Sequence, residues 1–293
     1  MRRLLLTSFL CMGLTAAPLS VAGADSPSSP TASGVGQEPV IYLDVQPSTW
    51  RPRGRVSFGI VPLVKMKLTS AGFTVTRDPE SPHDLILRVE YREDRGKPIA
   101  FNLSGTEITC HMVLEHPEQG RLISMSIHES PQYAELVTAP YVEVVEQFQA
   151  NPYFYFLGDL IRGRIDAHLD TTGALIQAVE RQFNRDEHPR IATPLDTLES
   201  PAETFPDLDL YFSGWARENA IEELGRLKDP RAIDLLERLM FHSDWRIRLR
   251  AVLALGEFDS QSIAPAMTRV AQTDSDTGVR KAAATVLARY SKP

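Results

Sequence analysis

Four of the seven histidines lie in or beside runs of apolar and β-branched residues, where the strands of a sheet could hold them as metal ligands. They are His83, His111, His116 and His128. None has the spacing of a metal site, because the sequence contains no H-x-x-x-H, no H-E-x-x-H and no C-x-x-C. We therefore predict neither a metal site nor another cofactor, and no residue is assigned to binding one.

A softer site for copper could be built from Cys110, Met112 and one histidine. If the chain turns at residues 117–119, His111 and Met125 would lie roughly opposite each other, with Cys110 on the other face of the sheet. We favour a packed sheet face instead, in which Cys110 is a buried and inert thiol.

Motifs for nucleophilic catalysis are missing from the sequence. It contains no G-x-S-x-G, no S-x-x-K and no glycine-rich phosphate loop, and residues 103–106 are predicted to form a turn. Carboxylates that could serve as a general acid and base are plentiful, for example Glu143, Glu146, Asp159 and Asp166. One sequence does not show which of them meet in a cleft. We predict no catalytic residues and no enzymatic activity, with a hydrolase as the open alternative.

Residues 40–184 are predicted to form an α+β domain. Apolar and alternating runs predict strands over residues 40–45, 73–76, 85–91, 99–115 and 121–129, the last two joined as a hairpin. A helix is predicted over residues 58–71, with Ile60, Val64 and Leu68 on one stripe and Gly72 at its end. Helices are also expected within residues 133–183, including a stripe over 173–183. The order of elements describes a mixed sheet with helices on one face, and it loosely resembles small periplasmic α/β envelope modules.

The aromatic run Pro152–Leu157 is the most unusual local feature of this domain. It is too short to span a bilayer. We interpret it as part of the core, with an exposed docking surface as the alternative.

The first residues predict export. Arg2 and Arg3 precede an apolar run of about 14 residues, Leu4–Ala17, and Ala22-Gly23-Ala24 fits an A-x-A cleavage site. Residues 1–24 are therefore predicted to be a cleavable signal peptide, and the mature chain to have no transmembrane segment and to lie in the periplasm or outside the cell. Cys11 would leave with the signal, so Cys110 would be alone and no internal disulfide would form.

Two segments have the composition of connectors. Residues 25–39 are rich in Ser, Pro, Gly and Thr and are predicted to be a disordered tether, and the Pro-rich, acidic residues 185–209 to be a linker. The formal net charge is -7, and loss of Arg2 and Arg3, with no acid in residues 1–24, makes it about -9. An acidic chain of this kind argues against nucleic-acid binding, which needs clustered Lys and Arg.

The most specific signal is an internal repeat in residues 210–293. Segments 216–225, 247–256 and 279–288 each place an Arg, then an Ala three residues later, then a Leu four beyond that. The alanines, Ala220, Ala251 and Ala283, are predicted to face a neighbouring helix, where only a small side chain lets the axes approach. Gly225 and Gly256 are predicted to end their helices. A second helix fills each unit, and Asp229-Pro230 is a start signal for one of them.

Over residues 213–290 these features resemble HEAT-like repeats of the short type found in bilin-lyase-like proteins. Two and a half units are fewer than a continuous repeat core usually needs, so we expect the stack to pack against the α+β domain or a second copy of the chain. Asp244 with Arg248 and Asp276 with Arg280, four residues apart at helix starts, are predicted to be capping and interlayer pairs.

Stacked helices and the lack of a reaction centre predict a non-enzymatic protein-binding or scaffolding module of the cell envelope. Two alternatives stay open. One is a periplasmic hydrolase or lyase-like enzyme with its site on the α+β domain, and the other is a ligand-sensing adaptor.

Overall fold

The computed structural model of the chain describes residues 38–51, 54, 56–100, 103–130, 140–186, 208–258 and 261–290. The predicted signal peptide and all of the predicted tether except Glu38 and Pro39 lie outside these residues. Glu38 is held by an ion pair, since its Oε1 lies 3.1 Å from Arg162 Nη2. The described part of the chain therefore begins slightly before the first strand.

The α+β part is built on one mixed sheet of five strands in the order β2-β1-β3-β4-β5. The strands are β1 Val40–Thr49, β2 Thr74–Thr76, β3 Leu85–Ala100, β4 Leu103–His116 and β5 Gly120–Glu129. β1 pairs in parallel with both β2 and β3. β4 pairs antiparallel with both β3 and β5. β5 is thus an edge strand.

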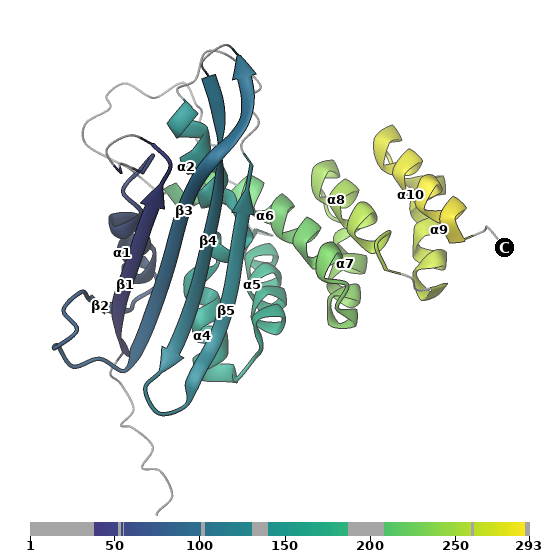
Figure 1. The fold of residues 1–293 in the computed structure, drawn as a ribbon. Coiled ribbons are helices and arrows are strands. Elements are labelled where there is room, and N and C mark those ends of the chain that lie inside the picture. Colours follow the sequence, from purple (N-terminus) through teal and green to yellow (C-terminus); the bar gives the residue numbers. More distant parts are fainter. Residues whose placement is uncertain are drawn as a thin grey trace, which may run out of the picture. The chain divides into compact units, whose positions relative to one another are not determined.

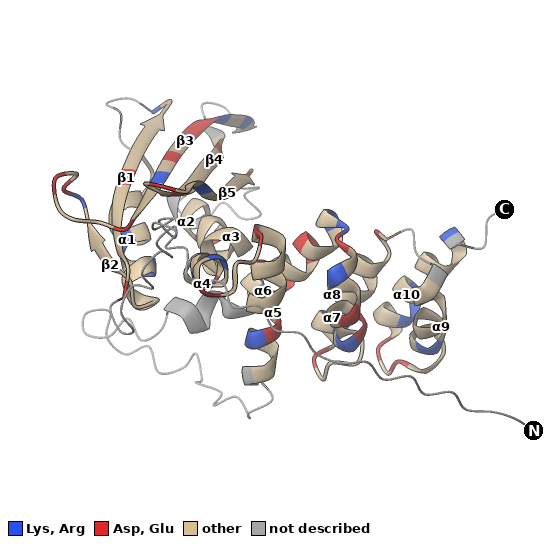
Figure 2. Cartoon of the chain, turned by 90° about the horizontal axis from the view of Figure 1, so that it is seen from below, with Lys and Arg blue, Asp and Glu red and all other residues tan. Residues whose placement is uncertain are grey.

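Only one face of the sheet is covered by helices (Figures 1 and 2). Inward residues such as Leu43, Leu87 and Ile127 are buried and their sequence neighbours are more exposed, as a half-buried sheet requires. The helices are α1 Ile60–Ser70, α2 Pro140–Ala150, α3 Pro152–Tyr155, α4 Leu157–Ala167 and α5 Thr171–Asp186. The prediction of an α+β fold with helices on one face of a mixed sheet is confirmed.

The first helix forms as its pattern predicts. Ile60, Val64 and Leu68 are all buried on one side of α1. Gly72 follows the helix with φ +92°, a left-handed conformation that glycine adopts without strain. This is the helix stop expected from the sequence.

The strands β3, β4 and β5 differ from the predicted ones at their ends and in their register. β3 continues through Ala100, and residues 103–106, predicted as a turn, belong to β4 because the two strands stay paired to the Ala100–Leu103 pair. His111 pairs with Ser126 and Met112 with Met125, so the expected juxtaposition of His111 and Met125 is wrong. Alternation places Met125 on the same buried face as Cys110.

The aromatic run folds as a corner of the core. Asn151 caps α3 by accepting a hydrogen bond from Tyr153 N at 3.1 Å, and Phe154 and Phe156 are buried. Phe154 packs against Phe148 of α2, with 4.7 Å between ring centroids. The core interpretation is confirmed, and only Tyr153 keeps part of its side chain in contact with solvent.

The C-terminal part is a stack of helices, with α7–α8 and α9–α10 visible as antiparallel pairs (Figure 1). The helices are α6 Leu208–Leu227, α7 Ile233–Leu239, α8 Trp245–Leu255, α9 Ala264–Thr273 and α10 Thr277–Tyr290, with short turns η3 Pro230–Ala232 and η4 Gln261–Ile263. α8 packs against α6, α7 and α10. Ala220, Ala251 and Ala283 are completely buried where these helices meet, as the repeat predicts.

The repeat glycines play the predicted role only in part. Gly256 is the C-cap of α8, so the predicted helix end is confirmed there, although its φ of −64° is not left-handed. Gly225 lies inside α6, so the predicted helix end is wrong there. A Cβ at Gly225 would lie 2.7 Å from the Cα of Ala254, and one at Gly256 would lie 2.7 Å from Val286 Cγ2. Both glycines are therefore needed for the close approach of adjacent layers. The left-handed residue after α6 is Lys228, with φ 52°.

The first repeat helix packs on the helices of the sheet as well as on α8. α6 contacts α2, α3 and α5, and Asn219 Nδ2 donates to the Ala150 carbonyl at 3.0 Å. α5 also contacts the repeats through Glu180, 2.5 Å from Arg238 Nη2. The expected packing of the repeats on the α+β part is thus seen. α5 extends to Asp186 and α6 begins at Leu208, so both ends of the predicted linker 185–209 belong to helices, and its residues 187–207 lie outside the described residues.

In the described parts of the chain, no helix is both long and apolar enough to cross a bilayer. The charged residues of α8, α9 and α10 are all Lys or Arg, whereas the Asp and Glu of this region lie in α7 and between the helices (Figure 2).

Candidate functional site: a cleft between the edge strand and the repeats

The histidines singled out in the sequence are scattered. His83 Nδ1 contacts the Ser81 carbonyl at 2.8 Å, His111 Nδ1 contacts Ser126 Oγ at 2.9 Å, and His116 Nδ1 accepts from Glu118 N at 3.1 Å. Within the described ranges, no three His, Cys, Asp or Glu side chains gather as metal ligands would. Cys110 is buried and unpaired, and desolvation raises the pKa of its thiol to about 12. His128 borders the cavity described below.

Of the carboxylates considered for catalysis, none borders that cavity. Asp159 lies 3.5 Å from Arg181 on the surface, Asp166 is exposed and Glu146 is partly buried. The side chain of Glu143 lies outside the described residues. Acid and base chemistry, if present, would therefore need other residues.

A cleft of ≈ 570 Å³ opens where the end of β5, the α2–α3 corner and the first two repeats meet. Its lining includes residues from all three places: His128, Glu129, Asn151, Pro152, Tyr153, Asn219, Glu222, Glu223, Arg226, Leu253, Ala254 and Glu257. Its size lies within the range of about 300–1,000 Å³ typical of ligand sites. The walls combine polar and apolar surface, so the cleft could hold an amphipathic group.

The centre of one wall is a tight cluster on α6. Arg226 donates from Nε and Nη2 to the two oxygens of Glu223, at 2.7 and 2.6 Å, and the Tyr153 hydroxyl donates to Glu223 Oε1 at 2.5 Å. Burial raises the pKa of Glu223, but the hydrogen bonds from Arg226 and Tyr153 outweigh it, and the net shift is downward. Burial and the Glu223 hydrogen bond raise the pKa of Tyr153. At neutral pH the cluster therefore holds a carboxylate, a guanidinium and a neutral phenol.

The cleft lining contains a second carboxylate in another environment. Glu129, at the end of β5, accepts a hydrogen bond from Asn151 Nδ2 at 2.7 Å. Burial raises the pKa of Glu129 and the Glu223 charge adds to the rise, although the Asn151 hydrogen bond and nearby His128 oppose it. The fold thus places one carboxylate where its charge is stabilised and a second where its charge is costly.

Such opposed shifts occur in acid–base catalysis. Here, however, both oxygens of Glu223 are already occupied by three donors from Arg226 and Tyr153, so accepting a proton would break the cluster. Glu129 has one donor from Asn151. The arrangement is better suited to holding a charged group than to transferring protons.

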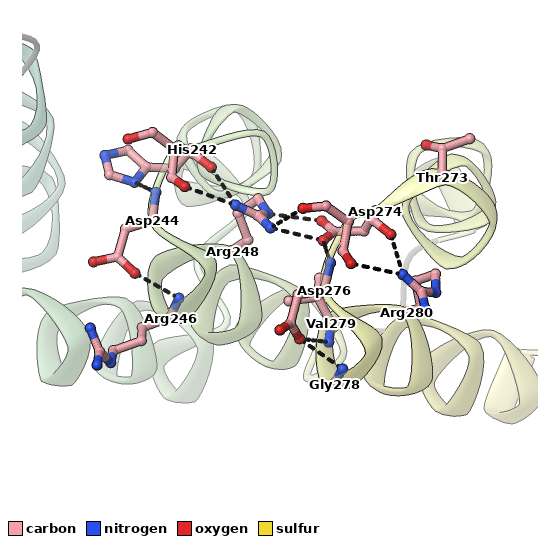
Figure 3. Close-up of polar contacts among 12 residues, drawn as sticks. His242, Asp244, Arg246, Arg248, Thr273, Asp274, Asp276, Gly278, Val279 and Arg280 are labelled. Carbon is pink, nitrogen blue, oxygen red and sulfur yellow. Dashed lines mark hydrogen bonds and ion pairs between the residues drawn. The ribbon is translucent and has the colours of Figure 1, made fainter.

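The stack itself contains a buried ion pair between layers. Arg248 of α8 contacts Asp274, which precedes α10, with Nε–Oδ2 and Nη2–Oδ1 distances of 2.8 and 2.9 Å (Figure 3). Arg248 Nη1 also donates to the carbonyls of His242 and Ser243, both at 3.0 Å. The predicted interlayer role of Arg248 is confirmed, but its partner is Asp274 in the next layer.

The other half of that prediction also holds. Asp244 caps α8 by accepting from Arg246 N at 2.9 Å, and Asp276 accepts from Gly278 N at 2.7 Å at the start of α10 (Figure 3). Arg280 was predicted to pair with Asp276. Its Nη1 donates instead to the carbonyls of Asp274 and Ser275. These contacts fix the loops that connect the helix pairs.

Large aromatic side chains are exposed on the repeats. Phe241 and Trp245, on either side of the α7–α8 loop, are 50% and 44% exposed, and Trp215 of α6 is 52% exposed. Arg269 lies over the Phe241 ring at 4.8 Å and Arg246 over the Trp245 ring at 5.3 Å. We call Phe241, Trp245 and their two arginines the aromatic edge. Trp and Arg side chains with this exposure are characteristic of binding surfaces.

Sequence reasoning missed the cleft residues, although a signal was present in the repeat register. Glu222 and Glu223 occupy the positions of Leu253 and Ala254 in the next unit, 31 residues on. An acidic pair in place of apolar residues marks a surface that faces something other than a normal repeat layer. Here that surface faces Tyr153 and the end of β5.

A comparison with the curated proteins finds no match to this chain. A scan against protein-family models finds one match, to the family described as HEAT repeats, over residues 212–288. That range runs from within α6 to near the end of α10, so the helical stack is similar in sequence to HEAT repeats.

Proposed function

We propose that this protein is exported to the cell envelope and binds a protein partner there through its HEAT-like repeats, without enzymatic activity. The observation that carries the proposal is the aromatic edge, where Phe241 and Trp245 stay half exposed while arginines stack on both rings. Exposed aromatic side chains supply most of the binding energy in many interfaces, and stacked helices offer an extended surface on which to place them.

The experiment compares partner capture by matched variants of the mature chain, residues 25–293. Phe241→Ala with Trp245→Ala removes the aromatic edge, and Met66→Ala with Trp50→Ala removes two side chains of similar exposure from the α+β part. A protein identified from envelope extract is then purified and its affinity for each variant is measured. We expect at least a tenfold loss for the repeat variant and wild-type affinity for the control. Equal affinity of both variants would contradict the proposal.

Export is tested separately from binding. Residues 1–24 are fused to a reporter that is active only outside the cytoplasm, and the N-terminus of the exported full-length protein is sequenced. We expect an active reporter and a mature chain that begins near Asp25. An inactive reporter would contradict export, and the partner would then have to be sought in another compartment. The proposal that the repeats bind a protein would not be affected.

Two finer parts of the proposal concern relatives and assembly. We propose that the repeats are of the short bilin-lyase type and that the α+β part is a relative of small periplasmic envelope modules.

We also propose that a second copy of the chain can cover the open end of the stack beyond α10. Sedimentation velocity over a range of concentrations tests this, since a mass that stays that of one chain would contradict it.

A further inference from the structure

Glu129 differs from the other carboxylates of the cleft in its partners. Glu223 is paired with Arg226, Glu222 with Arg250, and Glu257 Oε2 lies 3.9 Å from Lys228 Nζ. In the described parts of the chain the hydrogen bond to Glu129 comes from Asn151, a neutral amide, and its charged neighbours there are His128 and Glu223. A half-buried carboxylate without a guanidinium or ammonium partner raises the free energy of the folded protein when it is ionised.

The surroundings of Glu129 supply what a long cationic side chain needs. Pro152, Tyr153 and Leu253 of α8 line the cleft and provide apolar surface. Leu253 is 44% exposed, although the repeat would allow a polar residue at that position, as Glu222 shows one unit earlier. Lys and Arg bury their methylene stems along such surfaces while the charged head reaches a partner.

We propose that this cleft binds a lysine or arginine side chain from an extended basic segment of a protein partner, with the cationic head on Glu129 and the stem between Tyr153 and Leu253. The inference rests on the proposed protein-binding function and names the chemistry of the partner. The cleft volume of ≈ 570 Å³ leaves space for the residues beside the anchor. The formal charge of -7 attracts basic segments over longer distances.

The direct test measures binding of acetyl-hexalysine amide to the mature chain by isothermal titration calorimetry. Glu129→Gln should weaken binding at least tenfold, because it removes a carboxylate that is partly desolvated. Glu180→Gln is the control outside the cleft lining, where Arg238 already pairs with the carboxylate, and it should change binding about twofold or less. Equal effects of the two variants, or no binding of the peptide to the wild type, would overturn the inference.

Two further probes separate a peptide segment from a small amine. Leu253→Ser should weaken the peptide several-fold, because the stem loses its apolar contact. Spermidine at the same charge concentration should bind at least tenfold more weakly than the peptide, since it offers no flanking residues. Spermidine as tight as the peptide would assign the cleft to small amines and overturn the peptide part of the inference.

The stability of Glu129→Gln provides a readout that a purely structural role would not give. In the free protein the charged form of Glu129 is disfavoured by burial and by the charge of Glu223, and the opposing effects of Asn151 and His128 are smaller. The other charged or hydroxyl side chains that line the cleft are Tyr153, Glu222, Arg226 and Glu257. Glutamine keeps the acceptor for Asn151 without the charge, so the variant should melt at a higher temperature than the wild type. The gain should vanish as the pH falls through the raised pKa of Glu129. A lower melting temperature at pH 7 would show that Glu129 is structural.

Failure of this inference is distinguishable from failure of the proposed function. The variant without the aromatic edge, Phe241→Ala with Trp245→Ala, should bind hexalysine like the wild type. A partner that needs Phe241 and Trp245 but not Glu129 would leave the proposed function standing and remove the cleft from it.

Discussion

Arg248 and Asp274 form a two-pronged ion pair between successive layers of the repeat stack, and both side chains are nearly buried. Removing one partner leaves the other charge without compensation, which costs about 3–5 kcal/mol in comparable buried pairs. We therefore expect Arg248→Ala to lower the free energy of unfolding by about 3 kcal/mol, measured by urea denaturation. Arg238→Ala, which breaks the exposed pair with Glu180, should cost less than about 1 kcal/mol.

The same pair predicts a pH dependence. The hydrogen bond from Arg248 lowers the pKa of Asp274 below its ordinary value. The stabilisation is therefore complete above the ordinary aspartate pKa and is lost as the pH falls through the depressed one. In denaturation curves at several pH values, the difference between wild type and Asp274→Asn should be constant at neutral pH and shrink in acid. A difference that grows in acid would contradict the assignment.

The repeat glycines should differ in their tolerance of a methyl group. At Gly225 a Cβ would meet the backbone of Ala254, with 2.7 Å to Cα and 3.0 Å to the carbonyl oxygen. We expect Gly225→Ala to cost about 1–3 kcal/mol, because α6 and α8 must move apart. At Gly256 the nearest atom belongs to the Val286 side chain and not to backbone of the next layer, so Gly256→Ala should cost less, although the layers must still adjust. Thermal unfolding followed by circular dichroism measures both, and the reverse order would contradict the packing argument.

Glu93 should hold the segment after β1 in place. Its fully buried carboxylate accepts from Ser57 N at 2.6 Å and from the Tyr91 hydroxyl at 2.9 Å, and Arg51 Nε lies 3.5 Å away. Glu93→Ala leaves these donors unsatisfied, at a cost of about 1–3 kcal/mol for each one that stays buried. We expect faster hydrogen exchange at the Ser57 amide. Asp94→Asn, beside it on the surface, should leave that exchange rate unchanged.

Cys110 should be unreactive in the folded protein. Because burial raises the pKa of its thiol to about 12, almost none of it is thiolate at pH 8. We expect the thiol to resist a disulfide reagent under native conditions and to react fully in urea. Rapid modification of the native protein would show that β4 opens on the timescale of the assay.

Local patterns predicted the elements that depend on nearby residues. The stripe Ile60, Val64 and Leu68 identified α1, and apolar or alternating runs identified the five strands of the sheet. The buried alanines of the repeat were predictable because three copies constrain one another. Strand ends and register were less predictable, as Met125 shows, because a shift of one residue moves every side chain to the other face.

The cleft depends on contacts that no local pattern contains. Tyr153 and Glu223 meet across 70 residues, and Glu129 and Asn151 across 22. Gly225 was wrongly assigned to a helix end because glycine has two common roles in helices, and the sequence does not say which one applies. Distinguishing them needs the distance to the next layer, such as that from Gly225 to Ala254.

α6 belongs to two structures at once, since it packs on α2, α3 and α5 on one side and on α8 on the other. The sequence repeat is therefore not an independently folding unit. A fragment beginning at residue 213 would lose part of α6 and the neighbours that bury Ala216, and a fragment ending there would bare the helices that α6 covers. Unfolding should accordingly occur as one transition.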